Sequence, residues 1–210
     1  MYIPRAFAET DLGALDALFA HDAFVTLVTQ HAGEPFASHL PVLYARDGER
    51  IVISGHWARP NPQAGHIDGT ALMIVHGPHA YVSPSWYPGE ERRSRVPTWN
   101  YAVAHLYGSV SLVQDPDELA TLVAALGAKY EALSGGDWAY APERESHHDL
   151  LRGITGFRFV PERVELKFKL GQNHPAATVE AAAAVLVRRP GDGAQAVAAL
   201  MRDRLARRPS

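Results

Sequence analysis

Cysteine is absent from the 210-residue chain, which excludes disulfide bonds, thiolate metal ligands and a cysteine nucleophile. The sequence also lacks a run of about 18 apolar residues, the minimum for a membrane-spanning helix. Its first residues contain no apolar segment of the kind that secretory signals carry. These absences together predict a cytoplasmic protein that has no membrane partner.

The sequence also has no large excess of positive or negative charge, and it lacks several familiar motifs. The net charge of −3 gives no positive field that would attract nucleic acid. The GxSxG, GxxxxGK[ST] and GxGxxG patterns of hydrolases and nucleotide-binding proteins do not occur. The eleven histidines show no HExxH or comparable spacing, so no metal site is predicted.

Most of the sequence consists of short apolar segments separated by turn residues, a pattern typical of β-strands. One long helix is expected at 118–133, with further helices at both ends of the chain. Strand–helix–strand alternation is absent, which disfavours a parallel sheet. The sequence therefore predicts a mainly β protein with helices, of the α+β class, built as an antiparallel barrel with peripheral helices. The expected strands are 24–29, 35–45, 50–54, 70–77, 79–83 and 101–113, with two more within 153–171. A bulge is expected at Gly108, and the last two strands are expected to be separated at Pro161–Glu162.

The segment "SGHWARPN" places polar side chains at the end of an expected strand. Ser54, His56, Arg59 and Asn61 fall within eight residues. A phosphate group is bound by guanidinium, hydroxyl and imidazole donors near a tight turn, and this segment supplies all three. The alternative is an ordinary solvated turn, in which Asn61 caps a helix and Arg59 makes a surface ion pair.

The stretch from Gly77 to Gly108 is unusually rich in aromatic residues. Rings flanked by polar side chains suit a flat heteroaromatic ligand, whose face is apolar and whose edge needs hydrogen bonds. A subunit interface uses the same residue types, and both interpretations stand. The residues concerned are Tyr81, Ser83, Trp86, Tyr87, Thr98, Trp99, Asn100 and Tyr101.

The segment "KFKLGQN" alternates with a period of two, so Lys167 and Lys169 share one strand face. Two lysines beside Gln172 form either an anion contact or a solvated strand face. The C-terminal helical residues are locally basic, and we interpret them as a docking helix with a solvated arginine face. No charge pattern or recognition-helix motif supports DNA as a partner.

Several contiguous motifs occur in a distinctive order over residues 1–173: "MYIPRAF", "SHLPV", "GHWARPNPQ", "GPHAYVSPSWY", "VPTWNYAVAHLYG" and "KFKLGQN". The chain thereby resembles the PaiB-type family of FMN-binding negative transcriptional regulators. Gly171 stands where the family usually has serine, and Ala104 is an addition to the usual "AVH". The resemblance implies an FMN-binding split β-barrel over 1–174, with a helical extension at 175–210, that forms a homodimer with flavin between subunits.

The resemblance also implies where the flavin is held and what the protein does. His56 and Arg59 become the phosphate candidates, the aromatic segments border the ring, and no catalytic residue is identified. A regulator is the expected function; the alternatives are an oxidoreductase of the pyridoxamine-phosphate oxidase or flavin reductase class and a haem-handling barrel. The full set of expected FMN contacts is His56, Arg59, Asn61, Ser83, Trp86, Thr98, Trp99, Asn100, Lys167, Lys169 and Gln172.

Overall fold

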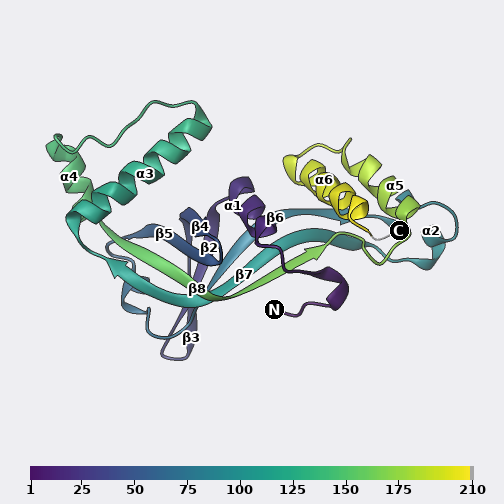
Figure 1. The fold of residues 1–210 in the computed structure, drawn as a ribbon, viewed down its shortest axis with the longest axis horizontal. Helices are drawn as coiled ribbons and strands as arrows, with labels where there is room; N and C mark the ends of the chain where they lie inside the picture. The colour runs from purple at the N-terminus through teal and green to yellow at the C-terminus, as the bar shows by residue number, and fades with distance from the viewer. Residues whose placement is uncertain (209–210) are drawn as a thin grey trace. The chain divides into compact units, whose positions relative to one another are not determined.

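The structure, a computed structural model, describes residues 1–208 (Figure 1). Its elements in chain order are η1 (Arg5–Phe7), β1 (Ala8–Glu9), α1 (Leu12–His21), β2 (Phe24–His31), β3 (Glu34–Pro41), β4 (Leu43–Asp47), β5 (Arg50–Ala58), η2 (Pro62–Gly65), β6 (Ala71–Val82), η3 (Pro84–Trp86), α2 (Glu91–Ser94), β7 (Thr98–Val113), α3 (Pro116–Ser134), α4 (Glu145–Arg152), β8 (Ile154–Lys169), α5 (Ala176–Leu186) and α6 (Asp192–Ala206).

The strands in the described residues form one sheet in the order β3-β2-β6-β7-β8-β5-β4, with β1 beside β8. The recorded pairs, such as His56 opposite Gly156 and Thr26 opposite His39, are antiparallel. The predicted antiparallel β fold with peripheral helices is therefore confirmed.

The chain divides into two compact units, each made of separate stretches of sequence. The first comprises residues 1–21, 76–104 and the described residues from 165 onward, and the second comprises residues 22–75 and 105–164. β6, β7 and β8 contribute residues to both. α5 and α6 belong to the first unit, so this division differs from the predicted boundary at 174, which stays a prediction. Residues 209 and 210 of the predicted extension lie outside the described residues.

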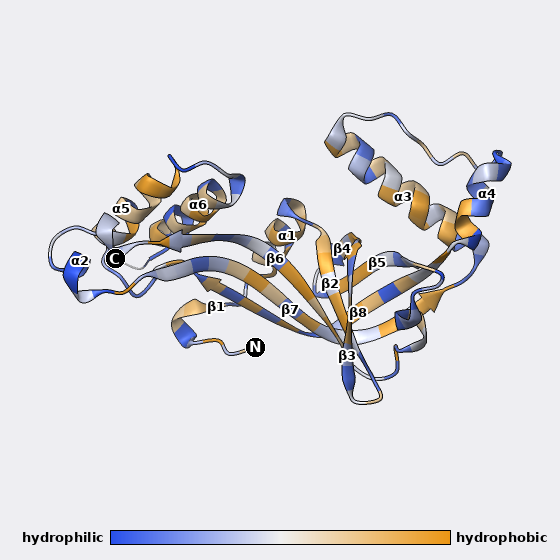
Figure 2. Ribbon diagram, turned by 180° about the vertical axis from the view of Figure 1, so that it is seen from behind, coloured by the Kyte–Doolittle hydropathy of each residue, from blue (hydrophilic) through white to orange (hydrophobic). Residues whose placement is uncertain are grey.

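In the first unit, α1, α5 and α6 cover one face of the strands (Figure 1). Alternation along β7 buries Asn100, Ala102 and Ala104, while Trp99 and Tyr101 lie on the opposite, partly exposed face. The hydrophobic colouring of α5 in Figure 2 matches its buried residues Val179, Ala182, Ala183 and Leu186. One sheet face is therefore sealed by helices, and the other carries the aromatic rings.

In the second unit, the predicted helix is present as α3. The Asp115 carboxylate caps it by accepting hydrogen bonds from the backbone N–H groups of Asp117 and Glu118, at 3.1 and 3.0 Å. The helix ends at Gly135, whose φ of 74° is a left-handed value that glycine adopts without strain. Its residues Leu119, Leu122 and Leu126, which share one helix face, are buried.

Two predicted strand breaks are wrong. β6 continues through Gly77–Pro78 and β8 continues through Pro161. Proline removes one ladder hydrogen bond, but its fixed φ is compatible with an extended strand, so a long strand can tolerate it. β5 runs on to Ala58, beyond the expected strand end at 54, and α4 is a helix that was not predicted.

Candidate functional site

His56 lies near the end of β5, in the second unit, and one of its ring nitrogens lacks a hydrogen-bond partner in the described chain. Its Nδ1 atom is buried and has no hydrogen-bond partner among the described residues. Burial lowers the pKa of His56 below its ordinary value of 6.5, because the charged imidazolium loses solvation. Gly156 lies opposite His56 on β8, and the Leu119 and Val113 side chains pack where a side chain at 156 would lie. A buried nitrogen without a partner is typical of a site that a ligand or water completes.

Arg59 follows His56 by three residues and is exposed. Its guanidinium donates to the Ile154 carbonyl at 3.1 Å, and its backbone N–H donates to the Gly153 carbonyl at 2.8 Å. No carboxylate within the described chain pairs with Arg59, so the expected alternative of a surface ion pair is not observed. Most of its five N–H donors therefore remain available to an anion.

Asn61 and Gln63 fix the loop that carries Arg59. The Asn61 amide accepts from the Gln63 N–H at 3.0 Å and donates to Ser38 Oγ at 2.9 Å, which leaves its side chain in use as a cap of η2. Gln63 is fully buried, and its Nε2 donates to the Leu27 carbonyl at 2.9 Å and to Thr29 Oγ1 at 3.2 Å. Sequence reasoning missed Gln63, since only its position after Asn61–Pro62 was visible.

Aromatic rings gather on the open sheet face of the first unit. Trp99 is 53% exposed, and its ring centroid lies 6.1 Å from that of Tyr81 and 6.0 Å from that of His79. The Trp86 ring meets Tyr81 edge-on at 6.5 Å and has the Arg189 guanidinium 5.3 Å from its centroid. The structure thus brings Trp86 and Trp99 together through Tyr81.

Ser83 and Gln172, two expected flavin contacts, are already bonded to nearby backbone. The Ser83 hydroxyl accepts from the Ser85 N–H at 3.2 Å, which starts η3. The Gln172 amide accepts from the Leu170 N–H at 2.7 Å and donates to the Phe168 carbonyl. Both side chains shape local turns in this structure.

The two lysines of β8 have different surroundings. The Lys167 ammonium lies 5.3 Å from the Tyr101 ring centroid, a cation–π contact. The Lys169 ammonium donates to the Thr98 hydroxyl and, at 2.6 Å, to the Trp99 carbonyl. Burial lowers the pKa of Lys169, and repulsion from Lys167 lowers it further. The structure thus brings Lys169, Thr98 and Trp99 together.

Asn100, another expected flavin contact, is buried beneath the C-terminal helices. It is 3% exposed, and its amide donates to the Met201 sulfur of α6 at 3.3 Å. Asn100 therefore faces the helices, on the side of β7 opposite the exposed aromatic rings.

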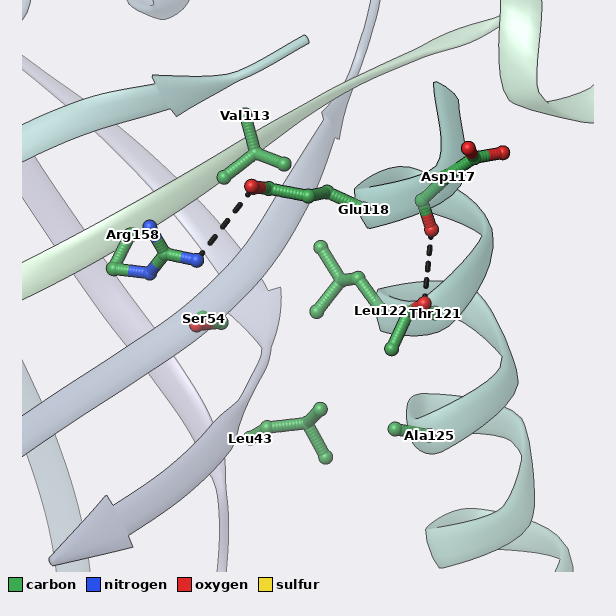
Figure 3. Close-up of a pocket in the computed structure, with 9 residues that line it drawn as sticks. All are labelled: Leu43, Ser54, Val113, Asp117, Glu118, Thr121, Leu122, Ala125 and Arg158. Atoms are coloured by element: carbon green, nitrogen blue, oxygen red, sulfur yellow. Dashed lines mark hydrogen bonds and ion pairs between the residues drawn. The ribbon is translucent and has the colours of Figure 1, made fainter. Parts of the chain in front are cut away.

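A pocket in the second unit lies between α3 and the sheet and has a volume of about 390 Å³ (Figure 3). Ser54 of β5 and Arg158 of β8 line it, on the same strand face as His56. The Arg158 guanidinium faces Glu118 at 3.6 Å, a long and exposed ion pair. Among the described residues no group of three metal-ligating side chains occurs, and no helix is long and apolar enough to cross a membrane.

Comparison with known proteins identifies the family to which the chain belongs. Residues 1–163 match the family model described as "Putative FMN-binding domain". The chain belongs to this family. It is 33% identical over 209 residues to the "Protease synthase and sporulation protein PAI 2" of Bacillus subtilis, covering 98% of each chain. An uncharacterized Emericella nidulans protein is 26% identical over 82% of this chain and 84% of its own. The predicted resemblance to the PaiB-type family is confirmed.

Solved structures with a similar fold support the same assignment at the level of architecture. A "putative 5-nitroimidazole antibiotic resistance protein" from Bacteroides thetaiotaomicron has a TM-score of 0.57 at 10% identity, covering 76% of this chain and 85% of its own. A FAD- and haem-binding protein from Mycobacterium smegmatis has a TM-score of 0.55 at 17% identity, covering 78% and 74%. These likenesses show the fold, a split barrel, and the family match supports a flavin as cofactor.

The residues at the end of β5 fit the phosphate end of a flavin nucleotide. The unpartnered Nδ1 of His56 and the available guanidinium of Arg59 are donors of the kind that a phosphate accepts. The exposed ring of Trp99 is, within the first unit, a surface of the kind that a flat heterocycle covers. The donor set therefore agrees with the family match.

Proposed function

We propose that the protein binds FMN and that His56 and Arg59 hold the phosphate. The observation that carries this proposal is the buried, unpartnered Nδ1 of His56, followed three residues later by an exposed guanidinium with one backbone acceptor. A phosphate satisfies both groups, and its charge favours the protonated imidazole that burial disfavours. FMN carries a single terminal phosphate, which matches one arginine and one histidine better than the pyrophosphate of FAD does.

The aromatic face of the first unit is proposed to border the flavin ring in a homodimer. Trp99 and Tyr81 are 53% and 43% exposed, more than large aromatic side chains are when they serve only a core. A second copy and a bound ring would together cover them. Trp86 and Lys167 complete this proposed border, whereas Asn61, Ser83 and Gln172 are proposed to shape the turns that support it.

When bound, FMN supplies the redox chemistry, and the chain supplies binding, orientation and exclusion of water. We propose a regulatory role of the PaiB type, on the likeness to the Bacillus subtilis protein whose name links it to protease synthesis and sporulation. Three tail arginines are paired with carboxylates: Arg202 with Glu180, Arg204 with Glu9 and Arg207 with Asp203.

The test is the absorbance spectrum of the protein as isolated, followed by FMN titration. We expect a flavin spectrum, its loss in Arg59→Ala and His56→Ala, and its retention in Arg152→Ala, which removes an exposed arginine of the same unit. A wild-type protein that neither carries nor binds FMN would overturn the proposal. Consumption of NAD(P)H by the FMN-loaded protein would indicate an oxidoreductase instead of a regulator. A Soret band after haem addition would indicate a haem-handling barrel.

A further inference from the structure

A second, smaller pocket lies in the first unit, where β7 begins and β8 ends. Its volume is about 190 Å³, room for about six water molecules. Donor groups from both strands and from the flanking segments converge on it. The lining residues are Phe7, Arg95, Val96, Thr98, Asn100, Lys169, Gly171, Asn173 and His174.

The charge of this pocket is positive. None of the lining residues is acidic, and Glu91, which is not among them, pairs with Arg95 at 2.8 Å and with His174 at 3.0 Å. Lys169 contacts only a hydroxyl and a carbonyl, both uncharged, and no carboxylate of the described chain pairs with it. The pocket therefore contains one ammonium group whose charge is not balanced. An oxyanion is the ligand that balances it.

Two further features favour a ligand over bulk water. Burial and the neighbouring Lys167 lower the pKa of Lys169, because both disfavour its charged form, and a bound anion would offset both effects. Within the described residues the buried Asn100 amide donates to the Met201 sulfur alone, a weak acceptor that an oxygen atom in the pocket would replace.

One side of the pocket, the turn at 171–174, is held by hydrogen bonds from Arg208 near the C-terminal end of the chain. The Arg208 guanidinium donates to the carbonyls of Gly171, Gln172 and His174 at 3.3, 3.2 and 3.0 Å. Gly171 has a φ of 83°, which lets the chain turn there without strain. Three bonds from one arginine hold this turn, so the donors are positioned before any ligand arrives, which lowers the cost of binding.

We infer that this pocket binds a small oxyanion, the carboxylate or phosphate group of a metabolite-sized molecule, independently of the flavin phosphate at His56 and Arg59. Lys169 makes the charged contact, with Asn173, Thr98 and Asn100 as neighbouring hydrogen-bonding groups. The two sites belong to different compact units of the chain. The expected flavin contact at Lys169 is thereby reassigned to a second ligand.

The test is isothermal titration of the full-length protein with inorganic phosphate and, separately, with acetate at constant ionic strength. We expect saturable binding of at least one probe, weakened about tenfold or more by Lys169→Met, since charged hydrogen bonds contribute on this scale. Arg92→Met is the matched control: it removes one positive charge from a neighbouring exposed position that does not line the pocket, and it should leave binding unchanged. Lys169→Gln serves if the methionine variant does not fold.

FMN titrations of the same variants separate this inference from the proposed function. We expect Arg59→Ala to abolish FMN binding and leave oxyanion binding intact. We expect Lys169→Met to weaken oxyanion binding and leave FMN binding intact. Oxyanion binding without any FMN binding would leave the inference standing while the proposed function fails. The inference is overturned by no saturable binding of either probe, by equal weakening in Lys169→Met and Arg92→Met, or by loss of FMN and oxyanion together in Lys169→Met.

Discussion

Trp57 Nε1 donates a hydrogen bond of 2.8 Å to Gln63 Oε1, and both side chains are almost fully buried. This bond ties the loop after β5 to the core of the second unit. Because the Gln63 amide also bonds to Leu27, Thr29 and Phe36, one side chain sets the position from which Arg59 leaves the strand. Gln63 is thus a positioning residue for the proposed phosphate site.

Replacing Gln63 by alanine leaves the Trp57 N–H and several acceptors buried without partners. We expect a loss of about 3 kcal/mol in the free energy of unfolding, in the range typical of a broken buried network. Urea denaturation measures this loss. The exposed Gln114→Ala is the control, and a similarly small effect in both variants would contradict the anchoring role.

Gly108→Ala tests the close approach of β7 and β8. A Cβ atom at position 108 would lie 2.1 Å from the Val160 carbonyl oxygen, a backbone atom that cannot move away alone. We expect destabilisation of about 2 kcal/mol or more, the scale of overpacking with a backbone shift. At Gly65 an added Cβ meets nothing within 4 Å, so Gly65→Ala should remain within about 0.5 kcal/mol of wild type in the same thermal or urea measurement.

The lowered pKa of His56 predicts a pH dependence with a definite sign. The unfolded chain binds a proton at this residue more readily than the folded chain, so stability at this site is complete well above pH 6.5 and falls as the pH drops below that value. We expect the melting temperature of wild type without flavin to fall more between pH 7.5 and 5.5 than that of His56→Phe. Saturating FMN should reduce or reverse this difference, because a phosphate stabilises the protonated ring. Equal pH profiles for the two proteins would refute the assignment.

Two arginines of α6 should differ in their contribution to stability. Arg204 pairs with Glu9, whose side chain is 9% exposed, whereas Arg202 pairs with Glu180 at a site where both side chains are more than 40% exposed. Arg204→Met leaves a carboxylate without its partner and should destabilise by about 2 kcal/mol, against at most about 1 kcal/mol for Arg202→Met. Chemical denaturation of both variants decides the point, and equal losses would show that the Glu9 pair has no special role.

Local signals in the sequence predicted the elements that depend on neighbouring residues. Asp115–Pro116–Asp117 specified the start of α3, and Arg189–Pro190–Gly191 falls in the break between α5 and α6. The contiguous motifs identified the family and, through it, the split barrel. Residue types alone left the aromatic stretch undecided between a ligand wall and an interface.

Features that depend on distant contacts were not visible in the sequence. The continuity of β8 through Pro161 depends on its neighbouring strands, and the burial of Gln63 depends on carbonyls contributed by β2 and β3. Arg208 was read as part of a solvated basic face, but it bonds to the turn at 171–174, more than thirty residues earlier in the chain. Such contacts cannot be predicted from residue spacing, because the number of residues between two positions does not determine whether they meet in the folded chain.

The pairing of Glu9 with Arg204 joins residues 195 positions apart, and the first unit draws on both ends of the chain. During synthesis on a ribosome, α1 emerges long before the helix that completes its unit. The second unit needs no residue beyond 164 and can assemble earlier, whereas the first must wait until translation is nearly finished. A chain cut short in its last helix would therefore leave an incomplete unit with exposed apolar strands, a natural target for cellular proteases.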